Sequence, residues 1–281
     1  MSIWFITGAS RGFGAEVTRA ALARGHRIVA TARNVDGVRS AFPDAGDALL
    51  PVALDVTNGG QLDAAVRAAT EKFGGIDVLI NNAGRGLLGA VEEATDNEVR
   101  SIYDVNVFGL LATTRAIAPV MRAARSGTIV NISSVGGFRG AAGFGIYSST
   151  KFAVEGITEA MREELAPLGI TVGLVEPGYF RTDFLDGSSL HVSAEITDYA
   201  DGPSGQTRTR AADVNHAQPG DPVRGAAAIV AAVDSGEFPV RLFLGRDTIA
   251  VVQDKLASVG GEVERQRATA ASTDHEDAAA V

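Results

Sequence analysis

Residues Ile3–Gly14 read IWFITGASRGFG, and this stretch decides the fold of the chain. A short apolar run, Ile3–Ile6, leads into a turn that carries Gly8, Gly12 and Gly14. A helical pattern follows at once, and a second β-rich run comes after it. Strand, glycine-rich turn, helix and strand form the opening unit of a parallel nucleotide-binding sheet.

The same alternation continues along the chain. The further elements that we expect are helices over 15–24, 60–73, 96–125, 147–168 and 223–233, and strands over 26–32, 49–54, 78–80, 128–132, 171–175 and 240–244. The strands are apolar throughout, which is typical of a sheet covered by helices on both faces. We therefore predict an α/β fold, a Rossmann-type doubly wound parallel β-sheet with helices on both faces, in a single domain over residues 1–247.

Three segments depart from this pattern. Residues 182–222 are polar and contain Gly and Pro, and we interpret this long stretch as a substrate lid. Residues 248–267 read as a C-terminal helical extension. Residues 268–281, which are small and charged, are expected to form a mobile tail.

Composition excludes several function classes. The 281 residues carry a net charge of −9, which disfavours nucleic acid or an anionic membrane as partner. The chain has no Cys, and its four His are scattered without ligand spacing, so we expect no metal site. The first residues run straight into an apolar strand without a basic segment, and we expect a cytoplasmic protein.

The glycine-rich turn suits a bound pyrophosphate. Small residues let the backbone approach the phosphates, and the N-terminus of the following helix favours an anion. The spacing is G-x-x-x-G-x-G, which differs from the G-x-G-x-x-G dinucleotide fingerprint. A merely flexible turn is the alternative, but its position between strand and helix favours phosphate binding.

The cofactor type is indicated at the end of the second strand. An acidic residue there would bind a free ribose 2′-hydroxyl, whereas Arg suits a 2′-phosphate. This strand ends Thr31-Ala32-Arg33 without a carboxylate, and Arg11 lies in the glycine-rich turn. Either Arg alone is compatible with an ordinary solvated side chain. Together they predict a two-guanidinium phosphate clamp and favour NADP(H) over NAD.

Tyr147 and Lys151 lie four residues apart, on one face of the expected helix. A nearby ammonium stabilises a phenolate, and it is expected to lower the pKa of Tyr147 toward the working range. The pair alone is also compatible with a half-buried Tyr beside a Lys whose charge reaches solvent. Its meaning depends on the rest of the chain.

From Ile3 to about Leu244, the chain resembles the classical short-chain dehydrogenase/reductase family. The motifs that carry the resemblance are Thr7-Gly8-x-x-x-Gly12-x-Gly14, Asp55-Val56, Asn81-Asn82-Ala83-Gly84, Asn106, Ser134, Tyr147-x-x-x-Lys151 and Pro177-Gly178. Each motif is weak alone, but their order and separations together are specific. The resemblance implies a nicotinamide cofactor and a Ser-Tyr-Lys site with an assisting Asn.

The resemblance also assigns roles. It implies that Tyr147 is the acid/base, that Ser134 binds the substrate oxygen, that Lys151 holds the nicotinamide ribose, and that Asn106 holds a water near Lys151. Together with the residue-based reading, it gives a cofactor-binding set of Gly8, Ser10, Arg11, Gly12, Phe13, Gly14, Arg33, Asp55, Val56, Asn82, Ala83, Gly84, Tyr147, Lys151, Pro177, Gly178, Phe180 and Thr182. The expected reaction interconverts a carbonyl and an alcohol by hydride transfer.

The substrate is less readable. Candidate walls of an apolar pocket are Phe138, Phe144, Tyr179, Phe184 and Leu185, some of which have packing of the lid as the alternative role. Arg139 has two readings, contact with an acidic group or a surface position. A dinucleotide-binding sensor or scaffold without turnover is a rival function. A sugar-nucleotide epimerase or dehydratase is a second rival, although little chain remains for its larger substrate domain.

Family resemblance also implies assembly. Members commonly dimerise through the helix bearing Tyr147 and its long neighbour, 96–125, and many form tetramers through the last strand. We expect a homodimer, with a tetramer as the alternative. The helical extension after Asp247 has room to cover the last strand, which would favour a dimer or a monomer.

Overall fold

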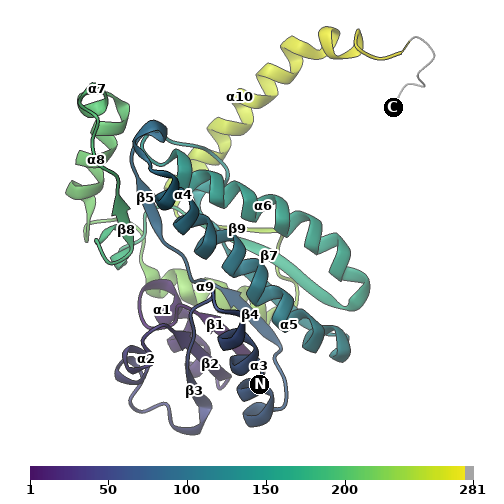
Figure 1. The fold of residues 1–281 in the computed structure, drawn as a ribbon. Helices are drawn as coiled ribbons and strands as arrows, with labels where there is room; N and C mark the ends of the chain where they lie inside the picture. Colours follow the sequence, from purple (N-terminus) through teal and green to yellow (C-terminus); the bar gives the residue numbers. More distant parts are fainter. Residues whose placement is uncertain (276–281) are drawn as a thin grey trace.

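The computed structural model of the chain describes residues 1–275, and its centre is one twisted parallel sheet (Figure 1). The seven strands, in sheet order, are β3 (Leu49–Ala53), β2 (Arg27–Ala32), β1 (Ile3–Thr7), β4 (Val78–Asn81), β6 (Gly127–Ile132), β7 (Ile170–Pro177) and β9 (Arg241–Leu244). Every neighbouring pair is parallel. The order reverses between β1 and β4, as expected for a doubly wound sheet.

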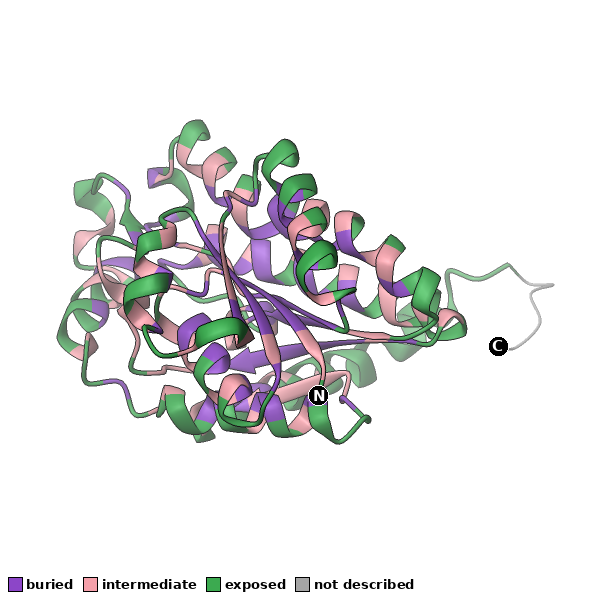
Figure 2. Cartoon of the chain, turned by 90° about the horizontal axis from the view of Figure 1, so that it is seen from below, coloured by how far each residue is buried: buried purple, intermediate pink, exposed green. Residues whose placement is uncertain are grey.

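Figure 2 shows buried strands at the centre of the molecule, with helices around them whose outer surfaces are exposed. Side chains alternate between the two faces of β1, so Trp4 and Ile6 enter one core and Phe5 the other. Helices α1 (Gly12–Ala23), α2 (Val35–Ala41) and α9 (Pro222–Asp234) cover the first face. Helices α3 (Gly59–Phe73), α5 (Leu110–Ala124) and α6 (Gly145–Leu165) cover the second. The predicted fold is therefore confirmed.

The long helix over 96–124 has three parts. Helix α4 (Asp96–Tyr103) passes through a π-helical segment, η3 (Asp104–Gly109), into α5. By length and composition the stretch is apolar enough to cross a membrane. In this fold it packs on α3, α6 and the strands β4 and β6, as a core helix. A π-helical turn inside an α-helix often lies at a functional site, and Asn106 lies in this one.

The segment interpreted as a lid is folded, although its sequence shows no clear periodicity. It contains β8 (Leu190–Val192), α7 (Thr197–Ala200) and α8 (Pro203–Val214). Strand β8 pairs in parallel with β5 (Gly86–Leu88), which lies more than a hundred residues earlier in the sequence. Glu93, which is buried, accepts hydrogen bonds from the Ile196 backbone at 2.9 Å and from Arg208 at 2.5 Å. The lid is thus held to the body by polar contacts between distant residues.

The C-terminal helix α10 (Arg246–Ala271) is longer than predicted. It continues four residues into the stretch that we expected to be a mobile tail, and a turn follows over 272–275. The rest of that predicted tail, 276–281, lies outside the described residues. Helix α10 begins beside β9 but then projects away from the body (Figure 1), so it does not run along the edge of β9 as the sequence suggested.

Candidate active site

A cleft of about 1780 Å³ opens at the carboxyl ends of β1, β2, β4, β6 and β7. Ligands of doubly wound sheets bind at this edge, next to the point where the strand order reverses. Typical small-molecule pockets measure roughly 300–1,000 Å³. This cleft therefore has room for a dinucleotide and a substrate together.

The glycine-rich turn lines one end of the cleft. Gly8 and Gly12 adopt positive φ angles of 66° and 55°, which a side chain disfavours. A Cβ on Gly14 would lie 2.3 Å from the Gly8 carbonyl oxygen and 2.5 Å from Asn82 Nδ2. Gly14 is not among the residues that line the cleft, and its contact with a cofactor stays a prediction. Glycine is required at this position because the first turn of α1 packs tightly against Gly8 and Asn82.

The end of β4 is joined to this turn by hydrogen bonds. Asn82 Nδ2 donates to the carbonyl oxygens of Thr7 and Gly8, at 2.9 and 3.1 Å. Thr7 Oγ1 accepts from the backbone N–H groups of Asn82 and Ala83. Asn82, Ala83 and Gly84 all line the cleft, as predicted from the sequence. Thr7 belongs to the glycine-rich motif named from the sequence, but no role was predicted for its side chain.

The two Arg residues of the expected phosphate clamp are used differently. Arg33 lines the cleft at the tip of β2, and within residues 1–275 it forms no salt bridge. Arg11 donates to Ser188 Oγ at 2.7 Å, to the Ser188 carbonyl oxygen and to Ser189 Oγ. Arg11 also lines the cleft, but in this conformation it ties the glycine-rich turn to the lid, so the two-guanidinium clamp stays a prediction.

Asp55 lies next to Arg33 at the same end of the cleft, together with Val56. Its Oδ1 accepts from the Thr57 hydroxyl at 2.7 Å and from the Thr57 backbone at 2.9 Å. These two bonds, with a smaller contribution from Arg33, hold the pKa of Asp55 below its ordinary value. Asp55 is thus a fixed carboxylate acceptor facing the cleft.

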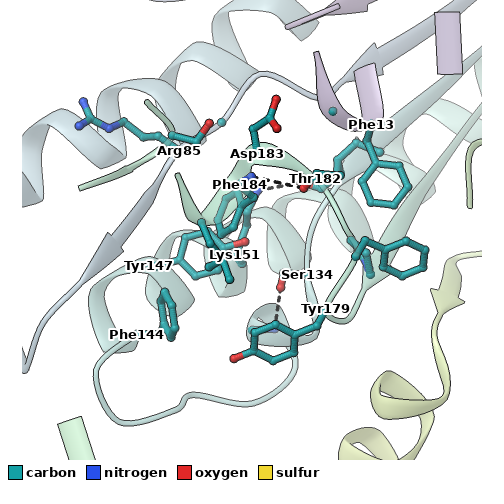
Figure 3. Close-up of a pocket in the computed structure, with 18 of the residues that line it drawn as sticks. Phe13, Arg85, Ser134, Phe144, Tyr147, Lys151, Tyr179, Thr182, Asp183 and Phe184 are labelled. Carbon is teal, nitrogen blue, oxygen red and sulfur yellow. Dashed lines mark hydrogen bonds between the residues drawn. The ribbon is translucent and has the colours of Figure 1, made fainter. Parts of the chain in front are cut away.

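Ser134, Tyr147 and Lys151 meet at the middle of the cleft (Figure 3). Ser134 follows β6, and the other two residues lie one turn apart on α6. Lys151 Nζ donates to the Ile132 carbonyl oxygen at 2.8 Å and lies 5.8 Å from the centre of the Tyr147 ring. Phe184 and Phe144 pack around that ring, with centroids 5.5 and 6.0 Å away. The predicted Ser-Tyr-Lys set is therefore assembled by the fold.

Burial dominates the acid–base properties of this set. It raises the pKa of Tyr147 to about 12, an effect that a hydrogen bond with Ser134 opposes and that the Tyr179 charge reinforces. It lowers the pKa of Lys151 to about 8, against the attraction of Glu155. The expectation that Lys151 lowers the pKa of Tyr147 is therefore wrong for the protein by itself. The phenol lies in an apolar pocket, and the ammonium group is bound to the Ile132 carbonyl.

Asn106 lies behind the cleft and does not line it. Its Oδ1 accepts from the Arg85 backbone at 2.9 Å, and its Nδ2 donates to the Arg85 carbonyl oxygen and to Thr150 Oγ1. A Cβ on Gly84 would lie 3.3 Å from Asn106 Oδ1 and 3.8 Å from Lys151 Nζ. Asn106 thus fixes the strand end beside Lys151 to the catalytic helix.

A buried acidic pair lies one turn beyond Lys151, and the sequence analysis missed it. Ser133 Oγ donates to Glu155 Oε1 at 2.5 Å. Arg241 Nε lies 3.3 Å from Glu155 Oε2 and 3.2 Å from Glu176 Oε1. Burial, with the nearby Glu155 charge, raises the pKa of Glu176 to about 8, against the attraction of Arg241. Glu155 is one of four Glu residues in α6, and nothing in the sequence indicates that it meets Glu176 of β7.

The other half of the cleft holds four of the five side chains that the sequence predicts to form a substrate pocket. Phe144, Tyr179, Phe184 and Leu185 line it. Phe138 does not, because it packs edge-on against Phe243 with ring centroids 6.5 Å apart. The other predicted cofactor residues that line the cleft are Ser10, Gly12, Phe13, Pro177, Gly178, Phe180 and Thr182.

One face of α8 also lines this half, and it is polar. Gln206, Thr207 and Arg210 project from it toward the cleft, and the Arg210 guanidinium lies 6.0 Å from the centre of the Tyr179 ring. Arg139 lines the cleft as well. Within residues 1–275, neither Arg forms a salt bridge. The spacing of these α8 residues is helical, but the sequence alone did not place the helix over the cleft.

Asp247 is a further cleft residue without a sequence signal. Its Oδ2 accepts from the Tyr179 backbone at 2.8 Å. A Cβ on Gly178 would lie 2.2 Å from the same oxygen, so the glycine makes this contact possible. The first turn of α10 therefore helps to shape the cleft. Within residues 1–275, no group of three His, Cys, Asp or Glu is arranged to hold a metal ion.

Comparisons with known proteins agree with this arrangement. Residues 2–192 match the family model described as short chain dehydrogenase. A 3-ketodihydrosphingosine reductase from Bacteroides thetaiotaomicron is 41% identical over 204 residues, which are 71% of this chain and 72% of that protein. The crystal structure of a short-chain dehydrogenase from Streptomyces avermitilis is 40% identical, with a TM-score of 0.88 over 98% of this chain and all of that one.

A nicotinamide cofactor is present in a more distant solved structure. The 3-ketoacyl-(acyl-carrier-protein) reductase from Brucella melitensis, complexed with NADH, is 26% identical and has a TM-score of 0.73. The alignment covers 86% of this chain and 96% of that one.

Proposed function

Because this chain belongs to the short-chain dehydrogenase family, we propose that it is an NADP(H)-dependent oxidoreductase that interconverts a ketone or aldehyde with the corresponding alcohol. The observation that carries the proposal is the buried Tyr147, which shares the middle of a dinucleotide-sized cleft with Ser134 and Lys151.

The cytoplasmic location and the homodimer expected from the sequence remain part of the proposal. Phe108 and Phe152, which are 56% and 46% exposed on the long helix and α6, support a dimer through those helices.

The residues at the first end of the cleft fit a nicotinamide dinucleotide. Gly8 and Gly12 place two residues without side chains in the cleft at the N-terminus of α1, where an anion is favoured. Asp55 presents a carboxylate acceptor, and Lys151 presents donors near the middle of the cleft. When bound there, the cofactor supplies or accepts a hydride.

Tyr147 handles the proton. At neutral pH its phenol is protonated, because burial raises its pKa to about 12, so it is ready to donate to a substrate carbonyl oxygen. Ser134 donates a second hydrogen bond to that oxygen and stabilises the charge that develops on it. In the oxidative direction the same phenol oxygen takes the proton of the alcohol. Phe144 and Phe184 keep water away from the transfer.

Consumption of NADPH distinguishes this proposal from the two rival functions, a sensor or scaffold and a sugar-nucleotide epimerase or dehydratase. When the protein is mixed with NADPH and a panel of ketones and aldehydes, the absorbance of NADPH is expected to fall at a rate proportional to the protein concentration. A sensor or scaffold would bind NADPH without consuming it. An epimerase or dehydratase would require a sugar nucleotide and would leave the cofactor unchanged in amount.

Arg33 carries the proposed preference for NADP(H). Arg33→Ala is expected to raise the KM for NADPH roughly tenfold, because it removes a cation from the tip of β2, and to change the KM for NADH much less. Steady-state kinetics with both cofactors measure this. Arg39→Ala, which removes a charge from α2 outside the cleft, is the matched control. Equal losses for both cofactors would contradict the assignment.

We propose that Arg210 makes the enzyme prefer a substrate that carries a polar group at one end. The apolar rings lie around Tyr147, while the α8 face offers the Arg210 guanidinium, which forms no salt bridge within residues 1–275. This arrangement suits a carbonyl compound with an apolar body and an anionic group. Arg210→Gln is expected to raise the KM of a keto acid about tenfold. The methyl ester of the same keto acid should be affected much less, and Arg224→Gln, remote from the cleft, should affect neither. A similar loss for acid and ester would refute the role.

A further inference from the structure

Helix α10 leaves the body of the protein after its first two turns (Figure 1). Thr248 and Val252 are buried against the body. Beyond Val252, only Lys255 and Gly261 are partly covered, and every other residue up to 275 is exposed. Roughly 28 Å of helix, from 253 to 271 at 1.5 Å per residue, therefore extends into solvent.

This helix carries an apolar stripe, formed by Ile249, Val252, Leu256, Val259 and Val263. The intervals are three, four, three and four residues, which is the a and d spacing of a heptad repeat. Leu256, Val259 and Val263 are 58%, 38% and 54% exposed. Because the stripe follows the 3.5-residue period, it faces one direction along the whole exposed length, as the contact side of a coiled coil does.

An exposed helix of this composition is poorly stable alone. Gly260 and Gly261 lie side by side in its middle, and glycine lowers helix stability in such positions. Isolated helices of this length are marginal in water, and most helical stability in proteins comes from packing of an apolar face. Among residues 1–275 the body covers Val252, whereas Leu256, Val259 and Val263 are left exposed. The geometry therefore requires a partner surface.

The charges beside the stripe indicate which partner fits. Lys255 and Glu262 are seven residues apart, so they occupy the same heptad position at the edge of the stripe. Within residues 1–275 neither forms a salt bridge, whereas Arg267 pairs with Glu264 on the same helix. In an antiparallel pair of α10 helices, positions of this kind face each other across the contact. Lys255 would then meet Glu262 of the partner subunit, and the two-fold axis would repeat the pair.

The same register aligns the apolar residues. When Leu256 faces Val259 of the partner subunit, the two-fold axis passes between Ala257 and Ser258 and repeats this contact on its other side. Such an isologous contact closes on itself and needs only one surface patch. A membrane is a poorer fit, because interfacial helices are usually basic. The exposed part of α10 carries three acidic and three basic residues, namely Asp254, Glu262, Glu264, Lys255, Arg265 and Arg267.

We propose that α10 is a self-association helix, which pairs in antiparallel orientation with α10 of a second copy of this chain through the apolar stripe. This contact is distinct from the oxidoreductase activity and from the dimer expected through α5 and α6. Asp247 and Val251, at the root of α10, line the cleft, so the contact begins beside the active site.

Distances between spin labels test the pairing in the full-length protein. Because the chain has no Cys, a single label is introduced by Ala257→Cys or by Ala268→Cys, both on exposed parts of α10. Pulsed electron paramagnetic resonance is expected to give about 20 Å between the two copies for the first label and roughly 35 Å for the second, from the helix rise and the spacing of packed helices. Equal short distances at both positions would mean parallel pairing and would overturn the proposal.

Charge exchange tests the register. In the Ala257→Cys background, Lys255→Glu is expected to reduce the population with the short distance at least threefold, because two Glu would then face each other. Adding Glu262→Lys should restore it, and Asp254→Lys, on the outer face of the helix, should leave it unchanged. The absence of a short distance in the unaltered α10, or immobilisation of the label by phosphatidylglycerol vesicles instead, would overturn the proposal.

Discussion

Replacing Tyr147 with Phe is expected to lower kcat by about 10³-fold or more while leaving NADPH binding nearly unchanged. Proton transfer by a positioned side chain contributes about 10²–10⁴ to a rate, and the substitution also removes a hydrogen bond to the developing charge. The ring itself is retained, so its packing against Phe144 and Phe184 persists. Single-turnover kinetics and a fluorescence titration with NADPH measure the two quantities separately.

The matched control is Tyr103→Phe. The Tyr103 hydroxyl donates to Ser149 Oγ at 2.8 Å, so this change removes one phenol that also contacts α6 but lies outside the cleft. It is expected to retain most of the activity. Wild-type kcat in the Tyr147→Phe variant would show that another group moves the proton. Equal losses in both variants would show that packing of α6, rather than the phenol, is the cause.

Much of the fold was predictable because each strand reads as a short apolar run. Trp4, Phe5 and Ile6 are all fully buried, although they face opposite sides of the sheet. Such a run is stable only between two layers of helices. The alternation of strands and helices then leaves few topologies, since parallel connections are short and right-handed.

The meeting of Ser134, Tyr147 and Lys151 in the cleft was predictable for a related reason. Tyr147 and Lys151 are spaced by one helical turn, and Ser134 follows a strand whose carboxyl end must lie at the ligand-binding edge. Local spacing and sheet geometry therefore place the three side chains before any coordinates are known. The pKa of Tyr147 was not predictable in this way, because burial depends on Phe184, which comes from the lid.

Contacts between distant segments account for what the sequence did not reveal. Arg11 reads as a phosphate ligand because of its place in the turn, yet its partners Ser188 and Ser189 lie more than 170 residues later. Phe138 reads as a pocket wall because it follows Ser134, but β9 supplies Phe243 to cover it. In each case a long-range partner of ordinary composition decides where the side chain goes.

The buried acidic pair behind α6 makes the free energy of unfolding depend on pH. Burial raises the folded-state pKa of Glu176 from 4.5 to about 8. Between these values the folded protein binds a proton that the unfolded chain releases, so the free energy of unfolding falls as the pH rises from about 4.5 to 8. Glu176 is thus a destabilising residue at neutral and alkaline pH, although it lies next to Arg241.

Glu176→Gln is therefore expected to raise the free energy of unfolding by on the order of 2 kcal/mol at pH 8, after allowance for the weaker attraction to Arg241. The gain should shrink toward zero below about pH 4, under the ordinary carboxyl pKa of 4.5, where the wild-type carboxyl is protonated in both states. Chemical denaturation followed by circular dichroism at both pH values measures the difference. Glu159→Gln removes the more exposed partner of Arg241 and should give no such gain. Destabilisation by Glu176→Gln at pH 8 would mean that the carboxylate is charged in the folded state, held there by the Arg241 guanidinium.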